Sequence, residues 1–85
     1  SVCTSLNEVC IHGVPDETVV QEGDILGLDI GTKLDGYYGD AAVTMPIGKI
    51  SPEDEALIAC SKEALYHAIE AIRPGMRFKE LTKIL

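Results

Sequence analysis

A two-residue turn between two apolar segments is the feature that most constrains how this chain folds. Asp35-Gly36 separates residues 25–33 from residues 37–47. Asp-Gly between apolar runs is a strong short-range signal for a β-hairpin. The loop is either Leu34-Asp35 or Asp35-Gly36, and the sequence leaves both registers open. In either case, residues 25–47 form the structural centre of the chain.

Each arm of the predicted hairpin contains one aspartate in its apolar interior, Asp29 and Asp40. Asp is depleted in strands, so neither is expected there on propensity. The first register places the two directly opposite, and the second makes them diagonal neighbours. Both registers put them on one face, because side chains alternate along a strand. Their repulsion calls for a shared proton, a cation or a metal ion, unless both simply face solvent on an open sheet.

The charge balance excludes some partners. The net charge is −7, with 14 acidic and 7 basic residues and no basic patch, so we expect no nucleic-acid partner. No apolar run approaches the roughly 18 residues of a membrane span, and we expect no membrane association. The chain has three cysteines, Cys3, Cys10 and Cys60, an odd number without the spacing of a disulfide framework. This favours reduced thiols and a cytoplasmic location.

A long helix is expected after the hairpin. Ser51 suits the N-cap and Pro52 the first helical position, with acidic residues in the first turn. The helix should run to about Ile72 and stop at residues 73–75, and another begins at Phe78. An apolar stripe along the long helix is expected to cover the apolar face of the hairpin. These elements predict an α+β fold, in one partial domain over 1–85 that is truncated at both ends.

Two histidines and two cysteines also bear on where a site lies. His12 is either a partly buried histidine bonded to backbone or a donor or acceptor beside the aspartates, and the local sequence decides neither. His67 lies in the middle of the long helix and is expected at the surface. Cys3 and Cys10 are expected as small apolar side chains in the core.

Several of these residues together resemble one family. SLNEVCIHGVPD at residues 5–16, followed by Asp29 and by Asp40 within DGYYGDAAVT, is similar to the type I methionine aminopeptidases. The resemblance covers essentially all 85 residues. It implies a partial pita-bread fold, in which an antiparallel hairpin sheet is covered by a long helix and this chain is the first half of the catalytic domain. It also implies cytoplasmic removal of the N-terminal methionine from nascent polypeptides.

The same resemblance implies a metal site. Such enzymes hold two divalent metal ions (Co, Mn, Fe or Zn) on two Asp, one His and two Glu. Asp29 and Asp40 match the two aspartate ligands, with Asp29 chelating one ion and Asp40 bridging both. His12 matches the catalytic histidine that contacts the substrate, and Cys3 falls where the methionine pocket is lined. The other three ligands have no counterpart here, so we expect the chain alone to be inactive.

Two other interpretations stay open. The chain is alternatively a non-catalytic, pita-bread-like binding or structural module, or a relative of the Xaa-Pro aminopeptidases. In each case half a domain should expose apolar surface, so we also expect possible self-association.

Overall fold

The computed structural model describes residues 1–85 and contains three strands and two helices. The strands are β1 (Val2–Leu6), β2 (Ile25–Leu34) and β3 (Tyr37–Pro46), and the helices are α1 (Pro52–Ala71) and α2 (Phe78–Leu81). The chain divides into two compact units, Ser1–Pro52 and Glu53–Leu85, and each is described by itself. The α+β class agrees with the prediction.

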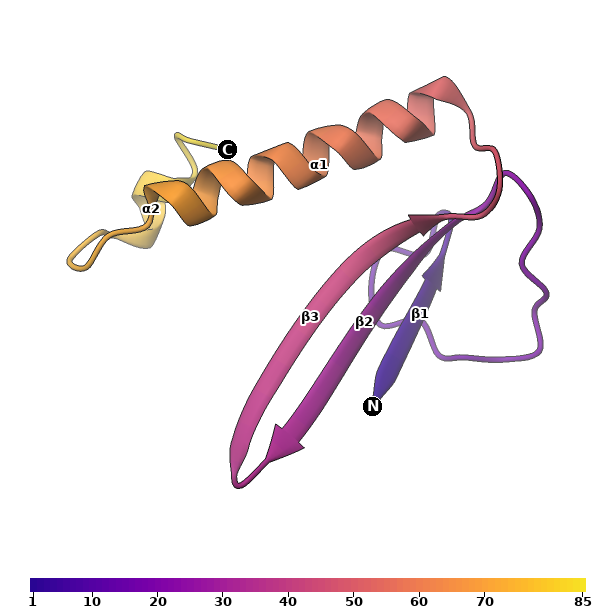
Figure 1. Ribbon diagram of the computed structural model, residues 1–85, viewed down its shortest axis with the longest axis horizontal. Helices are drawn as coiled ribbons and strands as arrows, with labels where there is room; N and C mark the ends of the chain where they lie inside the picture. Colours follow the sequence, from indigo (N-terminus) through magenta and orange to yellow (C-terminus); the bar gives the residue numbers. More distant parts are fainter. The chain divides into compact units, whose positions relative to one another are not determined.

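The three strands form one antiparallel sheet in the order β1-β2-β3 (Figure 1). Leu34 lies opposite Tyr37, so Asp35-Gly36 is the two-residue loop. Both loop residues have a left-handed backbone, with φ of 52° and 82°, as a type I′ turn requires. This turn selects the second of the two predicted registers and makes Asp29 and Asp40 diagonal neighbours.

The loop between β1 and β2 is fixed to the outer edge of β1 at Gly13. The Thr4 amide donates to the Gly13 carbonyl at 2.9 Å, and the Gly13 amide donates to Ser5 Oγ at 3.2 Å. A Cβ on Gly13 would lie 2.0 Å from the Thr4 carbonyl oxygen, which no real contact allows. Glycine is therefore required here by the close approach of two backbones.

A second set of hydrogen bonds closes the base of the same loop. Asn7, with φ of 50°, donates from Nδ2 to Asp24 Oδ1 at 3.1 Å. Its Oδ1 accepts from the Ile25 amide at 3.0 Å, and Asp24 Oδ2 accepts from the Gln21 amide at 2.9 Å. The Gln21 bond, and after it the Asn7 bond, lower the pKa of Asp24 below its ordinary value. The loop thus leaves and rejoins the sheet at one junction.

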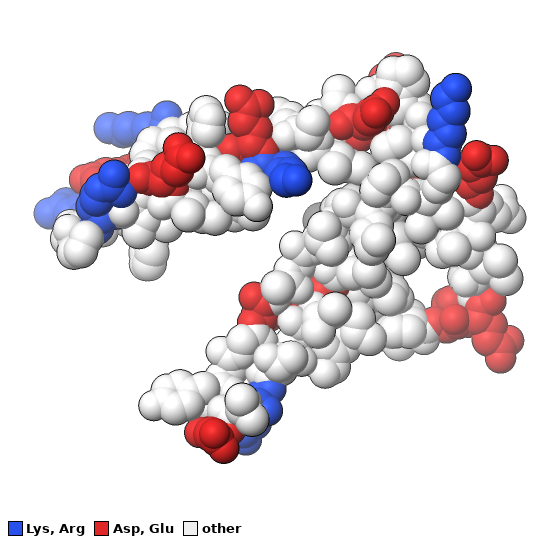
Figure 2. All heavy atoms as spheres, in the orientation of Figure 1, with Lys and Arg blue, Asp and Glu red and all other residues white.

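The sheet has an apolar face that stays open to solvent. No side chain of the 85 residues is buried, and Ile30 and Val43 on this face are 48% and 57% exposed. In Figure 2, uncharged atoms cover most of the visible surface of the sheet, and charged side chains gather at the tip of the β2–β3 hairpin. The apolar face carries Leu6, Leu26, Leu28, Ile30, Val43 and Met45. The predicted exposure of apolar surface is therefore present.

The second unit is built on α1, which begins at Pro52 with Glu53, Asp54 and Glu55 in its first turn. The negative charges of these side chains stabilise the helix, because they lie at the positive end of its dipole. At the other end, Arg73 Nη1 donates to the carbonyls of Glu70 at 2.6 Å and Ile72 at 2.8 Å. Gly75 follows with φ of 85°. The predicted helix and its stop are confirmed within one residue, whereas its covering of the hairpin stays a prediction.

The rest of this unit is a short helix followed by a turn. A helix does begin at Phe78, but it ends after one turn at Leu81, and the chain continues as a hydrogen-bonded turn. His67 is exposed, as predicted, and lies 3.8 Å from Glu63 one turn earlier. Neither helix combines the length and the apolar character needed to cross a membrane.

Candidate functional site

The sheet face opposite the apolar one carries both aspartates, and we call it the carboxylate face. Asp29 of β2 lies opposite Ala42 of β3, and Asp40 of β3 lies opposite Gly31 of β2. Because side chains alternate, the diagonal pair shares one face with the two small residues between them. The other members of this face are Ser1, Cys3, Ser5, Ile25, Gly27, Lys33, Tyr38, Thr44 and Pro46.

The two carboxyl groups interact directly. A side-chain hydrogen bond with Asp29, and after it the negative charge of Asp29, raise the pKa of Asp40 above its ordinary value. The pair therefore competes for one proton, or for a cation in its place. No group of three or more His, Cys, Asp or Glu side chains suited to a metal ion occurs among the 85 residues. The site consists of two carboxylates without a third donor.

The space beside the pair is open. A Cβ added to Gly31, next to Asp40, would meet only Ser1 Oγ at an ordinary 3.7 Å. Ala42 fills the position opposite Asp29 with a single methyl group. Two oxygen donors flanked by such small residues can accept a hard divalent cation from the solvent side.

Cys3 and His12 differ in how the structure places them. Cys3 is half-buried in β1, directly opposite Asp29, so the sheet brings it to the carboxylate face. His12 is exposed, with φ of 61°, and immediately precedes the Gly13 anchor. No hydrogen bond or ion pair joins the His12 side chain to either aspartate. The structure therefore brings together three of the four predicted residues and leaves His12 on the adjoining loop.

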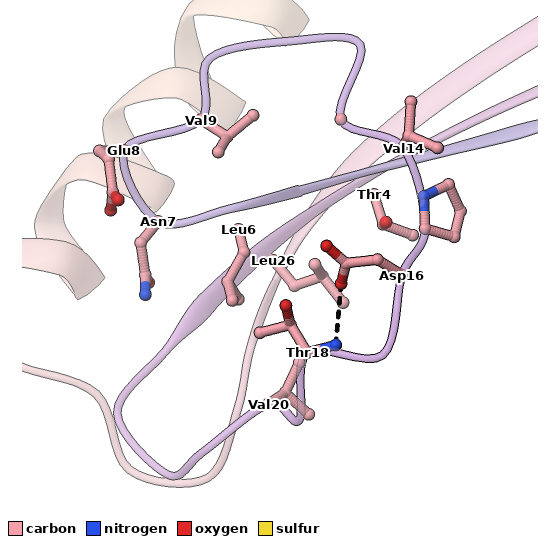
Figure 3. A pocket seen from close by; sticks show the side chains of 12 residues that line it. Thr4, Leu6, Asn7, Glu8, Val9, Val14, Asp16, Thr18, Val20 and Leu26 are labelled. Atoms are coloured by element: carbon pink, nitrogen blue, oxygen red, sulfur yellow. Dashed lines mark hydrogen bonds between the residues drawn. The ribbon is translucent and has the colours of Figure 1, made fainter.

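One cavity lies away from the aspartates. It has a volume of about 550 Å³ and opens between the 7–20 loop and the apolar face, where Thr4, Leu6 and Leu26 line it (Figure 3). Two carboxylates line it, Glu8 and Asp16, and Asp16 already accepts a hydrogen bond from the Thr18 amide at 2.8 Å. Hydrogen bonds from the Thr18 side chain and backbone lower the pKa of Asp16. We place the candidate site at Asp29 and Asp40, because there two carboxyl groups interact directly with one another.

A smaller cavity of about 160 Å³ lies on the carboxylate face beside the pair. Ser5, Gly27 and Thr44 line it from the three strands, together with Asn7, Val9, Cys10 and Ile25. Cys10 is exposed here, so its prediction as a core side chain was wrong. The error arises because the loop folds back along β1, a long-range arrangement that local apolarity does not encode. The His-Gly dipeptide was the available signal, since an obligatory glycine marks a close backbone approach.

Comparison with known proteins gives concordant results. The model of the family described as Metallopeptidase family M24 matches residues 1–85. The chain is 68% identical to a methionine aminopeptidase of Helicobacter pylori over 85 residues, which is all of this chain and 34% of that protein. It is 43% identical to methionine aminopeptidase 1 of Bacillus subtilis over 82 residues, 96% of this chain and 33% of that protein. The chain thus spans about a third of the length of these relatives.

Solved structures agree in fold. The methionine aminopeptidase of Thermotoga maritima matches with a TM-score of 0.94 at 39% identity, covering 98% of this chain and 34% of the other. The methionine aminopeptidase of Rickettsia prowazekii matches with a TM-score of 0.89 at 34% identity, covering 94% of this chain and 32% of the other. The predicted partial pita-bread fold is therefore confirmed.

Proposed function

This chain belongs to metallopeptidase family M24, and from that premise we propose that it is the aspartate-bearing part of a methionine aminopeptidase. The observation that carries the proposal is the Asp29–Asp40 pair, present in a chain 68% identical along its whole length to one such enzyme. Its substrates are then polypeptides that begin with methionine, in the cytoplasm. The chain corresponds to a third of the relatives' length, so the activity belongs to the whole protein.

The donor set fits a divalent metal. Asp29 and Asp40 offer hard oxygen ligands. A hydrogen bond with Asp29, and after it the negative charge of Asp29, raise the pKa of Asp40, and a cation held by both carboxylates would take the place of that proton. Asp29 and Asp40 would hold two divalent ions together with donors from the rest of the protein, and Co, Mn, Fe and Zn are all compatible with such ligands. When bound, the metal supplies a Lewis acid that polarises the scissile carbonyl and activates water at neutral pH. The remaining donors come from outside these 85 residues, since no third one joins the pair here.

The other two predicted residues are proposed to act on the substrate. Cys3 projects from the strand position opposite Asp29, so its thiol would line the pocket for the methionine side chain. His12 would reach the substrate from the loop, where neutral imidazole can donate or accept a hydrogen bond. The Gly13 anchor on β1 fixes the backbone from which His12 projects.

The first test is metal binding by the chain itself, measured by calorimetry with Mn²⁺. We expect Asp29→Asn and Asp40→Asn each to weaken binding at least about tenfold, since each removes a charged ligand. Asp35→Asn is the matched control. It removes the same charge from the same hairpin, and Asn tolerates the left-handed backbone of Asp35. Equal loss of binding in Asp35→Asn would show that net charge, and not a site, holds the metal.

The second test is catalysis. The chain alone should release no methionine from a Met-Ala peptide, because its site has two donors only. Metal-dependent release by the purified chain would contradict this. In the full-length protein, either asparagine variant should abolish turnover. Unchanged turnover in both would favour the alternative of a non-catalytic module, and release of residues before proline would favour an Xaa-Pro aminopeptidase.

A further inference from the structure

Ser5 is the one residue of β1 whose side chain hydrogen-bonds the 7–20 loop. Its Oγ accepts from the Gly13 amide at 3.2 Å, and the contact is partly buried. The neighbouring Thr4 amide donates to the Gly13 carbonyl at 2.9 Å. Gly13 is therefore held at both its amide and its carbonyl by two consecutive residues of one strand. All of these groups belong to this chain, so the contact does not depend on how the rest of the protein covers it.

The Ser5 hydrogen bond also fixes the orientation of the peptide that joins His12 to Gly13. A peptide unit is planar, so the direction of the Gly13 N–H sets the direction of the His12 carbonyl. His12 has a left-handed backbone, with φ of 61°. Residues other than glycine adopt this region uncommonly, and they persist in it where surrounding contacts hold them. The Ser5 hydroxyl makes such a contact with the peptide immediately after His12.

The direction of the His12 imidazole depends on this backbone. The Cα–Cβ bond of a left-handed residue leaves the chain in a different direction, relative to the flanking peptides, from that of a residue with negative φ. If the peptide after His12 turns away from Ser5, His12 is free to return to a negative φ, which L-residues prefer. A hydroxyl on β1 therefore controls where the imidazole of the loop lies.

We propose that Ser5 is a positioning residue for the reaction: its hydroxyl holds His12 in the left-handed conformation from which the imidazole meets the substrate. The register of the sheet supports this role. Cys3 lies directly opposite Asp29, and Ser5 lies two positions further along the same face of β1, about 7 Å away. The strand thus joins the anchor of His12 to the aspartate that binds the metal. The inference rests on the proposed function, in which His12 acts on the substrate.

The role requires a hydrogen-bond acceptor at residue 5. Ser5→Ala removes the acceptor and leaves the Gly13 amide without its partner, whereas Ser5→Thr keeps the hydroxyl. Threonine suits a strand, and the residue opposite Ser5 in β2 is Gly27, which has no side chain. Thr4→Val is the matched control. It removes the neighbouring hydroxyl, which does not bond Gly13, and keeps the Thr4 amide, which does.

The test is kinetic, on the full-length protein loaded with Mn²⁺ and with a Met-Ala peptide as substrate. Ser5→Ala should lower kcat/KM about fivefold, the effect of one lost hydrogen bond. Ser5→Thr should restore kcat/KM, and Thr4→Val should leave it unchanged. The affinity for Mn²⁺, measured by calorimetry, should be the same in all three variants, because neither residue is a metal ligand.

A double-mutant cycle shows whether Ser5 acts through His12. His12→Asn removes the imidazole, and Asn tolerates the left-handed backbone. Ser5→Ala should cause no further fall of kcat/KM in the His12→Asn background, because no imidazole is left to position. A purely structural role of Ser5 gives the same fivefold fall in both backgrounds. That result, or an unchanged kcat/KM in Ser5→Ala alone, would overturn the proposal.

Failure of the proposed function gives a different result. If the unmodified full-length protein releases no methionine, the proposed function is wrong, and NMR of Ser5→Ala still decides whether the hydroxyl sets the conformation of His12. The Cα and Cβ chemical shifts of His12 should change in Ser5→Ala and stay the same in Thr4→Val. Unchanged shifts in Ser5→Ala would overturn the positioning role, whether or not methionine is released.

Discussion

At the scale of single residues, Gly13 is the position where the structure tolerates least change. In Gly13→Ala the new methyl would lie 2.0 Å from the Thr4 carbonyl, so the loop must move away from β1. Such crowding typically costs about 1–3 kcal/mol. We expect the Thr4 amide, which donates to Gly13, to exchange with solvent about tenfold faster or more, as measured by NMR.

The control is the next residue along the loop. Val14→Ala removes atoms from a side chain that is 81% exposed, and should leave the Thr4 exchange rate as it is. Equal rates in Gly13→Ala and the unmodified chain would contradict the close approach of the two backbones. Loss of methionine-substrate binding in the full-length protein should accompany Gly13→Ala, since His12 would move with the loop.

Asp24 gives a prediction about pH. Its pKa is lowered in the folded chain by the Gln21 amide and the Asn7 side chain. The stabilisation is therefore present above the unfolded pKa and is lost as the pH falls through the folded pKa. Asn7→Ala removes one of the two hydrogen bonds, so the pKa of Asp24 should rise toward its ordinary value. Carboxyl-carbon NMR titration measures this.

Asp16 is an internal control in the same titration. Its pKa is also lowered, but by hydrogen bonds with Thr18 and not with Asn7. The titration curve of Asp16 should be the same in the unmodified protein and in Asn7→Ala. A shift of Asp16 together with Asp24 would mean that Asn7→Ala disturbs the whole loop and not one hydrogen bond.

At the scale of elements, the end of α1 depends on a side chain rather than on backbone alone. Arg73 donates to the carbonyls of Glu70 and Ile72, where it also opposes the negative end of the helix dipole. Arg73→Ala should cost about 0.5 kcal/mol locally and raise exchange of the Ile72 amide about twofold. Arg77→Ala, beyond the helix end, should leave that amide unchanged. Unchanged exchange in Arg73→Ala would mean that residues 74 and 75 end the helix by themselves.

The elements also show what a sequence can and cannot predict. The hairpin, the long helix and its stop were predictable, because Asp35-Gly36, Pro52 and Pro74 act on their immediate neighbours. The register was left open between two loops, and the left-handed backbone of both Asp35 and Gly36 decided it. The pairing of β1 with β2 was not predicted, because Cys3 and Asp29 are joined by no local turn.

The candidate site also has one part that the sequence predicts and one part that it does not. Asp29 and Asp40 could be found because two acidic residues interrupt apolar strands of one hairpin, and any register puts them on one face. The nearby cavity that includes Cys10 could not be found, because it depends on how residues 7–13 return along β1. Long-range contacts of this kind follow from the whole fold and not from a local pattern.

At the scale of the whole molecule, the exposed apolar surface should dominate behaviour in solution. With no buried side chain, the chain should bind the dye ANS and melt over a broad range. Val43→Thr keeps the shape of a side chain on the apolar face, and should reduce ANS fluorescence. Val14→Thr changes an equally apolar side chain in the loop, and should have a smaller effect. A sharp transition at high temperature without ANS binding would contradict this picture.

The way the long loop is fastened has a consequence for how this part of the protein can vary. The loop is held at Asn7, at Gly13 and at Asp24, so its longest segment without a hydrogen bond to a strand is residues 14–20. Lengthening a flexible segment costs little additional closure entropy, about 0.6 kcal/mol for each doubling. Natural variation in chain length should therefore concentrate between Val14 and Val20, where it alters neither the strand register nor the spacing of the two aspartates.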